Sequence, residues 1–237
     1  MKLLDIFTGT GSVAKVAKEL GYEVTSLDID SRCNPTVCAD IISLDYKDMW
    51  DPHEFDIVWS SPPCDYFSAA RRSNIGRKVR GELVTVETLL RDAENIGVPV
   101  LRRCQEIIEY LQPKVWFIEN PYTGKMKDYI TKKPIIYDYC MFGFKYRKRT
   151  AIWSNKKGLV DCKCDRSHLV NGRHQMTCIG SSMTQKGQGG GDSKKGRYAI
   201  PKELVELLID VDRVTVYLMN PVKIKMKLNE IKNKMKW

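Results

Sequence analysis

Residues 3–12 read LLDIFTGTGS, an apolar run that ends in a turn with two glycines. The run is typical of a buried strand, and apolar residues then recur at helical spacing from Val13 to Leu20. The glycines permit a tight turn and a close approach of the backbone to a ligand. The first amides of the helix can bind an anionic group such as a carboxylate. This segment therefore predicts the first strand and helix of an α/β domain.

Three later segments repeat the pattern of an apolar strand that ends in polar residues. Residues 23–27, 55–59 and 115–118 are expected to be strands, and residues 98–111 are expected to form a helix before the last of them. Strands separated by helices favour parallel pairing with right-handed crossovers. We expect a three-layer, Rossmann-like α/β sheet in which the polar clusters meet at the carboxyl ends of the strands, where open sheets of this kind bind ligands.

The regular pattern fails in the last third of the chain. Polar residues and glycines dominate residues 161–197, which predicts an irregular segment with a flexible loop at 187–191. Leucines at helical spacing after Pro201 predict one more helix, and a lysine-rich tail follows it. We expect a catalytic domain at 1–155, a small irregular segment at 156–196, and a returning helix with a basic tail at 197–237.

The composition favours a polyanionic partner. The 237 residues carry a formal net charge of +10, although a solvated basic surface without a partner is the plain alternative. The sequence contains no apolar run long enough to span a bilayer and no signal peptide, so we expect a soluble, intracellular protein. Part of the positive charge follows Cys64 closely, in Arg71, Arg72, Arg77, Lys78 and Arg80.

Asp28, at the end of the second expected strand, indicates a nucleoside ligand. A carboxylate at this position can accept hydrogen bonds from both ribose hydroxyls. The lysine of a phosphate-binding loop and the full dinucleotide fingerprint are both missing. A methionine-derived nucleoside that carries a carboxylate fits the glycine turn better than a nucleotide does. Asp40 either binds the adenine amino group or caps a turn.

Cys64 follows the third expected strand behind two prolines that stiffen the backbone and fix its direction. A buried cysteine beside a turn is the plain alternative, but Glu119 stands at the mouth of the next strand and a basic run follows at 145–149. Nearby positive charge favours a thiolate. A thiolate that adds to carbon 6 of cytosine activates carbon 5, while Glu119 can hold ring nitrogen 3 and an arginine the carbonyl oxygen. The base must leave a duplex to be reached.

The order of these motifs over roughly the first 155 residues resembles the cytosine-5 DNA methyltransferase family, and its compact phage and viral members in particular. The matching pieces are residues 7–12, Asp28, Asp40, Pro63–Cys64 with Phe67–Ser68, Glu119–Asn120, Arg147 and Arg149. The resemblance implies S-adenosylmethionine as the cofactor and DNA as the partner. It implies that Cys64 is the nucleophile and that Glu119 and one of the two arginines, Arg147 or Arg149, contact the base.

The resemblance also assigns binding residues. The implied cofactor contacts are Phe7, Thr8, Gly9, Thr10, Gly11, Ser12, Asp28, Ile29, Asp40, Ile41, Ser61 and Pro63. We expect the nucleic acid to contact Ser68 and the basic residues Arg71, Arg72, Arg77, Lys78 and Arg80.

The chain departs from the family pattern at several positions. Asp65 replaces the usual glutamine after the cysteine, Pro121 replaces a valine, and Lys145 replaces a glutamine. Only about 156–195 is available to recognise the target, whereas reading several base pairs needs an interface on the order of a thousand Å². We therefore expect a short or relaxed target site, or a partner that supplies specificity or a matching nuclease. RNA as substrate and an inactive, nucleic-acid-binding descendant are the alternatives.

The irregular segment contains residues that could bind zinc. Its ligand types are Cys162, Cys164, His168, His174 and Cys178. Four of them could organise a loop too small to fold alone. Their spacing is not one of the common structural-zinc patterns, and cysteines that simply stay reduced are the alternative.

Overall fold

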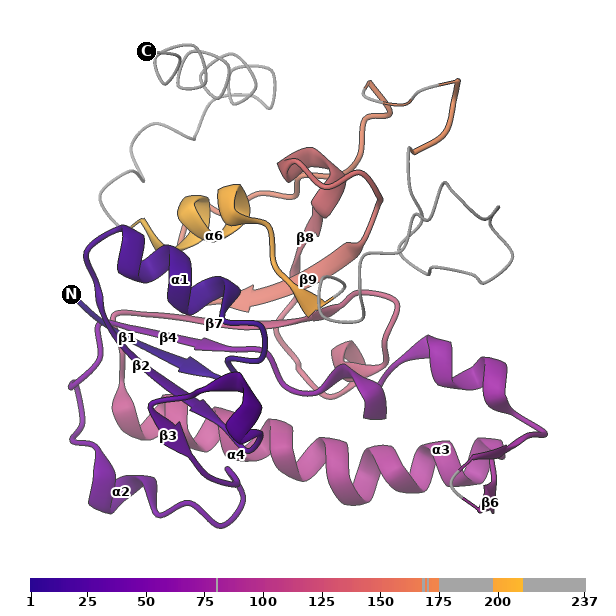
Figure 1. Cartoon of the computed structure of the whole chain (residues 1–237), viewed down its shortest axis with the longest axis horizontal. Coiled ribbons are helices and arrows are strands. Elements are labelled where there is room, and N and C mark those ends of the chain that lie inside the picture. The colour runs from indigo at the N-terminus through magenta and orange to yellow at the C-terminus, as the bar shows by residue number, and fades with distance from the viewer. Residues whose placement is uncertain (80, 168, 170, 175–197, 211–237) are drawn as a thin grey trace.

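A computed structural model describes residues 1–79, 81–167, 169, 171–174 and 198–210, which Figure 1 shows in colour. These residues form a seven-stranded sheet with the strand order β3-β2-β1-β4-β7-β9-β8. The strands are β1 (Lys2–Ile6), β2 (Glu23–Asp28), β3 (Val37–Cys38), β4 (Ile57–Ser60), β7 (Val115–Pro121), β8 (Ile135–Asp138) and β9 (Arg149–Ser154). The Rossmann-like α/β fold predicted from the sequence is therefore confirmed.

The sheet is parallel from β3 to β7 and antiparallel beyond it. β1 pairs in parallel with β2 and β4, and β4 pairs in parallel with β7. The strands expected from the sequence therefore pair in parallel, whereas β9, which the sequence did not predict, runs antiparallel to β7 and to β8. The physical reason is local: only a four-residue 3-10 turn, Tyr139–Phe142, and a short loop separate β8 from β9, too little chain for a parallel crossover.

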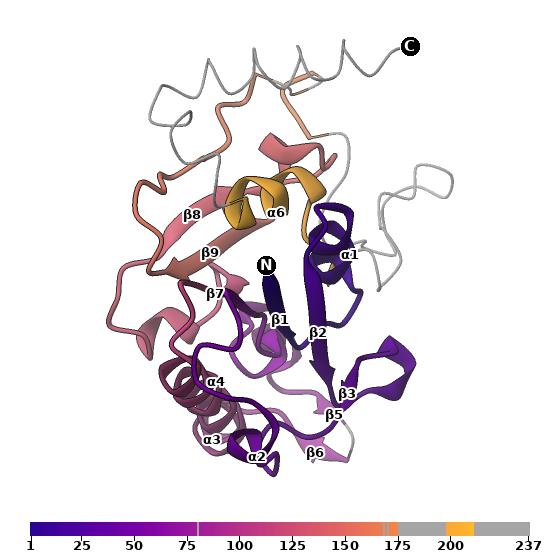
Figure 2. The same ribbon diagram turned by 90° about the vertical axis from the view of Figure 1, so that its left-hand side faces the viewer.

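Helices cover both faces of the sheet (Figures 1 and 2). α1 (Ser12–Glu19) and α6 (Lys202–Ile209) pack together on one face, and α2 (Tyr46–Met49) and α4 (Val98–Leu111) lie on the other. Each face has its own apolar core, one with Leu101 and Ile107 of α4 and the other with Val16 of α1 and Leu204 of α6. These two cores make the sheet the middle of three layers.

The helix before β7 is longer than the sequence predicts. α3 (Val86–Asp92) continues through a π-helical stretch, Ala93–Gly97, into α4. Pro99, in the first turn of α4, has no N–H to donate, and its ring would clash with a carbonyl one turn back in a regular helix. The wider π turn just before it avoids this conflict, so the helix passes the proline without ending.

Two further regions are relevant to the expected sites. A small antiparallel hairpin of β5 (Lys78–Val79) and β6 (Glu82–Leu83) lies beside α3. The predicted loop at 187–191 and the basic tail lie outside the described residues. Within the described part of the chain, none of the helices combines the length and hydrophobicity needed to cross a bilayer.

Candidate active site

A cavity of about 450 Å³ opens at the carboxyl ends of the parallel strands. Its volume lies in the range of small-molecule sites. Most of the cofactor contacts expected from the sequence line it, namely Phe7, Thr8, Gly9, Thr10, Ser12, Asp28, Ile29, Asp40, Ile41, Ser61 and Pro63. The exception is Gly11, which is the N-cap of α1. Cys64 and Glu119 line the same cavity, so the expected cofactor and chemical residues share one space.

The glycine turn is fastened to the end of β2. The Gly9 amide donates to one carboxylate oxygen of Asp28 at 2.9 Å, and the Asp30 amide donates to the other at 2.9 Å. Gly9 and Gly11 have φ angles of +48° and +70°, which favour glycine. These contacts hold Asp28 in the cavity wall.

The residues of this half of the cavity fit S-adenosylmethionine. The amino end of α1 and a carboxylate at the end of β2 provide complementary groups for a carboxylate and for ribose hydroxyls. Ile29 and Ile42 line the cavity and are 66% and 46% exposed, which offers an apolar surface for a flat ring. The carboxylate of Asp40 accepts the Ile42 amide at 3.0 Å, so it caps a turn as well as lining the cavity.

Asp5 is a buried carboxyl group of this wall that the sequence did not single out. Its side chain accepts the Thr8 hydroxyl at 2.8 Å and is only 2% exposed. Burial raises the pKa of Asp5 to about 7, and the hydrogen bonds from Thr8 and the Ala14 amide oppose that rise. The sequence held one signal for Asp5: it lies inside an apolar run that is typical of a buried strand. A carboxylate in a buried strand needs hydrogen-bond donors around it.

Cys64 begins a short 3-10 turn, Cys64–Tyr66, directly after Pro63. Burial raises the pKa of the Cys64 thiol to about 11, and the charges of Asp65 and Glu119 raise it further while Lys148 lowers it. The sequence led us to expect that nearby positive charge would favour a thiolate. In the structure, desolvation and the two carboxylates outweigh the one lysine, so the pKa of the thiol lies above its ordinary value and not below it.

Glu119 and Asn120 hold the chemical half of the cavity together. Ser60 of β4 pairs with Ile118 of β7, so the segments that follow these two residues leave the sheet side by side. The Asn120 side chain donates to the Pro62 carbonyl at 3.0 Å, which ties the turn of Cys64 to β7. Glu119 is buried and accepts the Tyr139 hydroxyl at 3.2 Å. Sequence reasoning missed Tyr139, because it missed the antiparallel strands that place it.

The structure does not bring the two predicted arginines into the cavity. Arg149 donates to both carboxylate oxygens of buried Asp138, at 2.9 and 2.7 Å, and Arg147 is exposed. Lys148, between them, lines the cavity and lies 4.9 Å from the centre of the Tyr139 ring. Neighbouring side chains of an extended segment point to opposite sides, so the basic run can present only part of its charge to the cavity.

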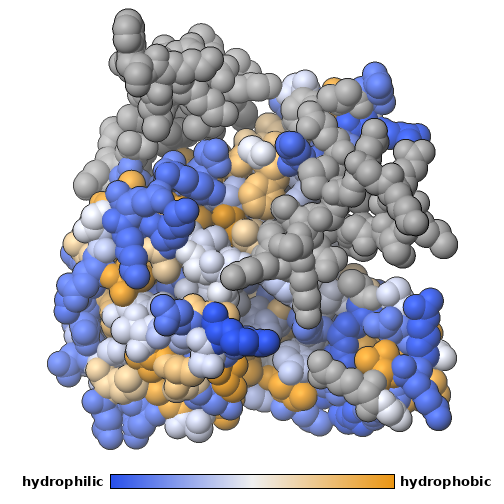
Figure 3. All heavy atoms as spheres, in the orientation of Figure 1, coloured by the Kyte–Doolittle hydropathy of each residue, from blue (hydrophilic) through white to orange (hydrophobic). Residues whose placement is uncertain are grey.

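The basic residues that follow Cys64 lie away from the sheet, near the β5–β6 hairpin. Arg71 is engaged with Asp92 of α3 at 2.6 Å, and Ser68 is half-buried. Arg72, Arg77 and Lys78 are exposed, and Arg80 lies outside the described residues. Figure 3 shows this end of the molecule, to the lower right, as mostly hydrophilic around a small apolar patch. Arg72, Arg77 and Lys78 are therefore accessible to a polyanion.

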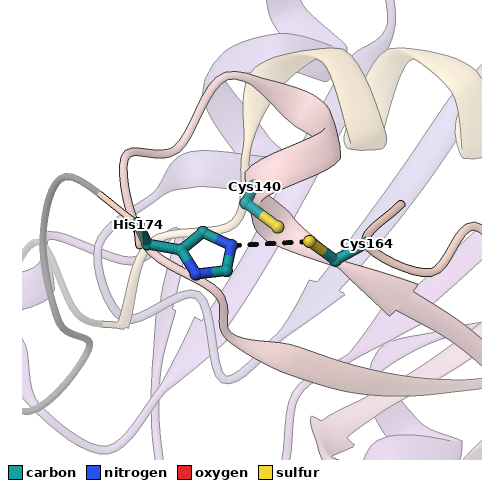
Figure 4. Close-up of side chains that lie close together, drawn as sticks. All are labelled: Cys140, Cys164 and His174. Atoms are coloured by element: carbon teal, nitrogen blue, oxygen red, sulfur yellow. Dashed lines mark hydrogen bonds between the residues drawn. The ribbon is translucent and has the colours of Figure 1, made fainter. Parts of the chain in front are cut away.

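The expected zinc ligands are only partly brought together. Cys164 lies beside His174, with 3.5 Å between its Sγ and the histidine Nε2, and beside Cys140 (Figure 4). Cys162 is not in this group, and its backbone forms a bridge with Tyr137. His168 and Cys178 lie outside the described residues. Cys140 stands 22 positions before Cys162, too far along the chain for spacing alone to suggest it.

A Rossmann-like sheet whose glycine turn, Asp28 and Cys64 meet in one cavity defines the class of S-adenosylmethionine-dependent methyltransferases. Over 221 residues the chain is 39% identical to the "Probable DNA (cytosine-5)-methyltransferase" of Frog virus 3 (isolate Goorha). The match covers 89% of this chain and 100% of the viral protein. The chain therefore belongs to the DNA (cytosine-5)-methyltransferase family. No family model matches it.

Solved methyltransferase structures are more distant. The chain is similar to the Entamoeba histolytica methyltransferase EhMeth, with a TM-score of 0.46 and 14% identity over 69% of this chain and 57% of that one. It is also similar to the S. pombe Dnmt2 methyltransferase, with a TM-score of 0.45 and 16% identity over 68% and 53%. The chain thus spans little more than half of the length of either structure.

Proposed function

We propose that this protein transfers the methyl group of S-adenosylmethionine to carbon 5 of cytosine in DNA, with Cys64 as a covalent nucleophile. The observation that carries the proposal is the shared cavity: Cys64 and Glu119 line it together with Asp28 and the glycine turn. The relative from Frog virus 3 supports the choice of reaction, because it bears the name of a DNA (cytosine-5)-methyltransferase.

Cys64 activates a base that is otherwise a poor carbon nucleophile. The Cys64 thiol gives its proton to solvent, the thiolate forms a bond to carbon 6, and the electrons of the 5,6 double bond move to carbon 5. Carbon 5 then attacks the methyl group. Bound S-adenosylmethionine would supply this methyl group from its sulfonium, which becomes a neutral thioether when the methyl group leaves. Solvent takes the proton from carbon 5, which restores the double bond and expels the Cys64 thiolate, and the thiolate regains its proton from solvent. The enzyme residue is unchanged at the end of the cycle.

Glu119 and Lys148 supply the charges that this addition needs. The carboxyl group of Glu119 holds or protonates ring nitrogen 3, and the Tyr139 hydroxyl at 3.2 Å keeps it in place. Lys148 lines the cavity and favours ionisation of Cys64, so we assign to Lys148 the stabilisation of negative charge on the thiolate and on the carbonyl oxygen. This assignment replaces the arginine role suggested by the sequence.

Two features support DNA as the substrate: the positive charge of the protein, and the position of Cys64 inside a cavity that a base must enter. The net charge of +10 and the exposed Arg72, Arg77 and Lys78 suit a phosphate backbone. A cytosine can reach Cys64 only if it leaves the stack of the duplex, because the thiol lies in a cavity. The basic surface would then position the strand while the cavity accepts one base.

The decisive experiment measures methyl transfer from labelled S-adenosylmethionine to matched duplex DNA and RNA, followed by bisulfite sequencing. We expect 5-methylcytosine in DNA, and a loss of at least about a thousandfold in Cys64→Ser. Cys38→Ser is the control, because Cys38 is exposed and does not line the cavity. Methylation of RNA alone would replace the substrate assignment. Full activity of Cys64→Ser would refute the covalent mechanism.

A further inference from the structure

Three side chains that can bind a metal ion meet outside the cavity, at the antiparallel edge of the sheet. The Sγ atoms of Cys140 and Cys164 and a ring nitrogen of His174 all lie within 4.8 Å of one another (Figure 4). Cys140 is buried in the 3-10 turn after β8, and the other two belong to the irregular segment. We propose that these three residues bind one zinc ion that fastens the irregular segment to the sheet.

The distances within the group match zinc coordination. Tetrahedral zinc with bonds of about 2.3 Å to sulfur and about 2.0 Å to nitrogen sets a sulfur and a nitrogen about 3.5 Å apart and two sulfurs about 3.8 Å apart. The Cys164 Sγ and the His174 Nε2 are 3.5 Å apart. The third ligand atom lies within 4.8 Å of both, so a shift of less than about 1 Å brings all three to coordination distance.

The backbone around Cys164 is held independently of any metal. The Cys162 amide donates to the Ile136 carbonyl at 2.8 Å, and the Asp138 amide donates to the Cys162 carbonyl at 2.9 Å. The Cys164 amide donates to an Asp138 carboxylate oxygen at 2.8 Å. These bonds dock the segment along β8, and Cys140 lies in the turn that directly follows this strand. Two of the three ligands are therefore pre-positioned, and a preformed site lowers the cost of metal binding.

The ligand set favours zinc over other common metals. Two thiolates and an imidazole are soft and borderline donors, which bind Zn²⁺ well and Mg²⁺ or Ca²⁺ poorly. Two thiolate charges also neutralise the divalent ion, which suits a site that includes the buried Cys140. Three protein ligands leave one position for water or for another thiol. Cys178 lies outside the described residues, and the proposed site does not depend on it.

The zinc site would stabilise the side of the cavity that holds Glu119. Cys140 directly follows Tyr139, whose hydroxyl donates to Glu119, and Asp138 binds both Cys164 and Arg149. The ion would thus join the segment that the sequence assigns to target recognition to the residues that hold the catalytic carboxylate. This role resembles that of structural zinc in domains whose core is too small to fold alone.

The first test measures zinc in protein purified without chelators. We expect about one zinc per chain in the wild type and in Cys162→Ser, and loss of stoichiometric zinc in Cys164→Ser and His174→Ala. Cys162→Ser is the matched control, since Cys162 lies two residues from Cys164 and outside the cluster. Far-UV circular dichroism verifies that each variant is folded. A wild type without zinc, or loss of zinc in Cys162→Ser with retention in Cys164→Ser, would overturn the proposal.

A second test needs no variant. Co²⁺ added to metal-free wild-type protein should give the strong visible bands of tetrahedral cobalt and the ultraviolet charge-transfer band of thiolate ligands. Zn²⁺ should then displace the cobalt and slow proteolysis after residue 156, while the same amount of Mg²⁺ should have no effect. A weak octahedral spectrum would overturn the proposal, as would a disulfide between Cys140 and Cys164 in the protein as purified.

Discussion

The two walls of the cavity differ in how the chain builds them. The cofactor wall comes from consecutive strand–turn–helix units, so Asp28 and the glycine turn stand close together through local order in the sequence. The base wall combines the turn of Cys64, the end of β7 and an antiparallel edge formed by β8 and β9. Strand-end motifs therefore reveal the cofactor wall, whereas the groups that we propose to act on the base depend on contacts between distant segments.

Glu119→Gln should have the largest effect among the following changes, because it removes the carboxyl group from the base wall and leaves the cofactor wall intact. General acid–base groups contribute about 10²- to 10⁴-fold, so kcat should fall within that range while binding of S-adenosylmethionine is unchanged. Glu109→Gln, on the exposed face of α4, is the control. The measurements are steady-state methylation and calorimetric titration of the cofactor. A matched loss of cofactor affinity would mean that the two walls are not separate.

Asp5→Asn tests the cofactor wall through the pH dependence of stability. The folded pKa of Asp5 is about 7, above its ordinary value of 3.8, so the folded state prefers the neutral carboxyl. The stabilising effect of the proton is complete below about pH 4 and is lost as pH rises towards 7. Asparagine is neutral at every pH and keeps an acceptor for the Thr8 hydroxyl. Above pH 7, the free energy of unfolding of the variant should therefore be higher than that of the wild type by up to about 4 kcal/mol.

The check on Asp5 is chemical denaturation of both proteins between pH 4 and pH 8. The difference in free energy of unfolding should grow between pH 4 and pH 7 and then stay constant. A difference that is independent of pH would show that Asp5 titrates normally in the folded protein.

Lys148→Gln and Arg147→Gln together test which cation stabilises negative charge in the cavity. The structure favours Lys148, whereas the sequence suggested an arginine. Lys148 lowers the pKa of Cys64 and lines the cavity, whereas Arg147 is exposed. We expect a loss of roughly 10- to 100-fold in kcat for Lys148→Gln and less than about twofold for Arg147→Gln at saturating DNA. The rate of Cys64 alkylation by iodoacetamide at pH 8, followed by peptide mass spectrometry, should also fall in Lys148→Gln. The reverse order of effects would restore the arginine assignment.

Tyr139→Phe should have the smallest effect, because Tyr139 acts through Glu119. Removing the hydroxyl deletes one hydrogen bond to the buried carboxyl group, which we expect to lower kcat by about three- to tenfold. The KM for DNA should stay unchanged, because Tyr139 positions Glu119 and is not expected to contact the DNA backbone. Tyr110→Phe is the control, because Tyr110 packs against Tyr46 and does not line the cavity. An unchanged kcat would limit Tyr139 to packing.

Much of the fold and of the cofactor wall could be predicted from the sequence. The strands around 3–7, 23–27, 55–59 and 115–118 and the helix at 98–111 were predicted close to their observed bounds, because apolar periodicity reports burial directly. The prediction failed at β8 and β9, where aromatic and basic residues obscure the alternation and the partner strand is distant in the chain. Antiparallel pairing of this edge depends on β7, which a local pattern cannot report.

The sequence by itself determined the α/β class, the glycine turn and the approach of Cys64 and Glu119 to one edge, since parallel strands end on the same side of a sheet. Only the tertiary structure decided which cation faces the cavity, which tyrosine holds Glu119, and that burial raises the pKa of the Cys64 thiol. It also brought Cys140 to Cys164 and His174. The physical reason is that side-chain direction, desolvation and ligand geometry depend on neighbours in space, and the sequence lists neighbours only along the chain.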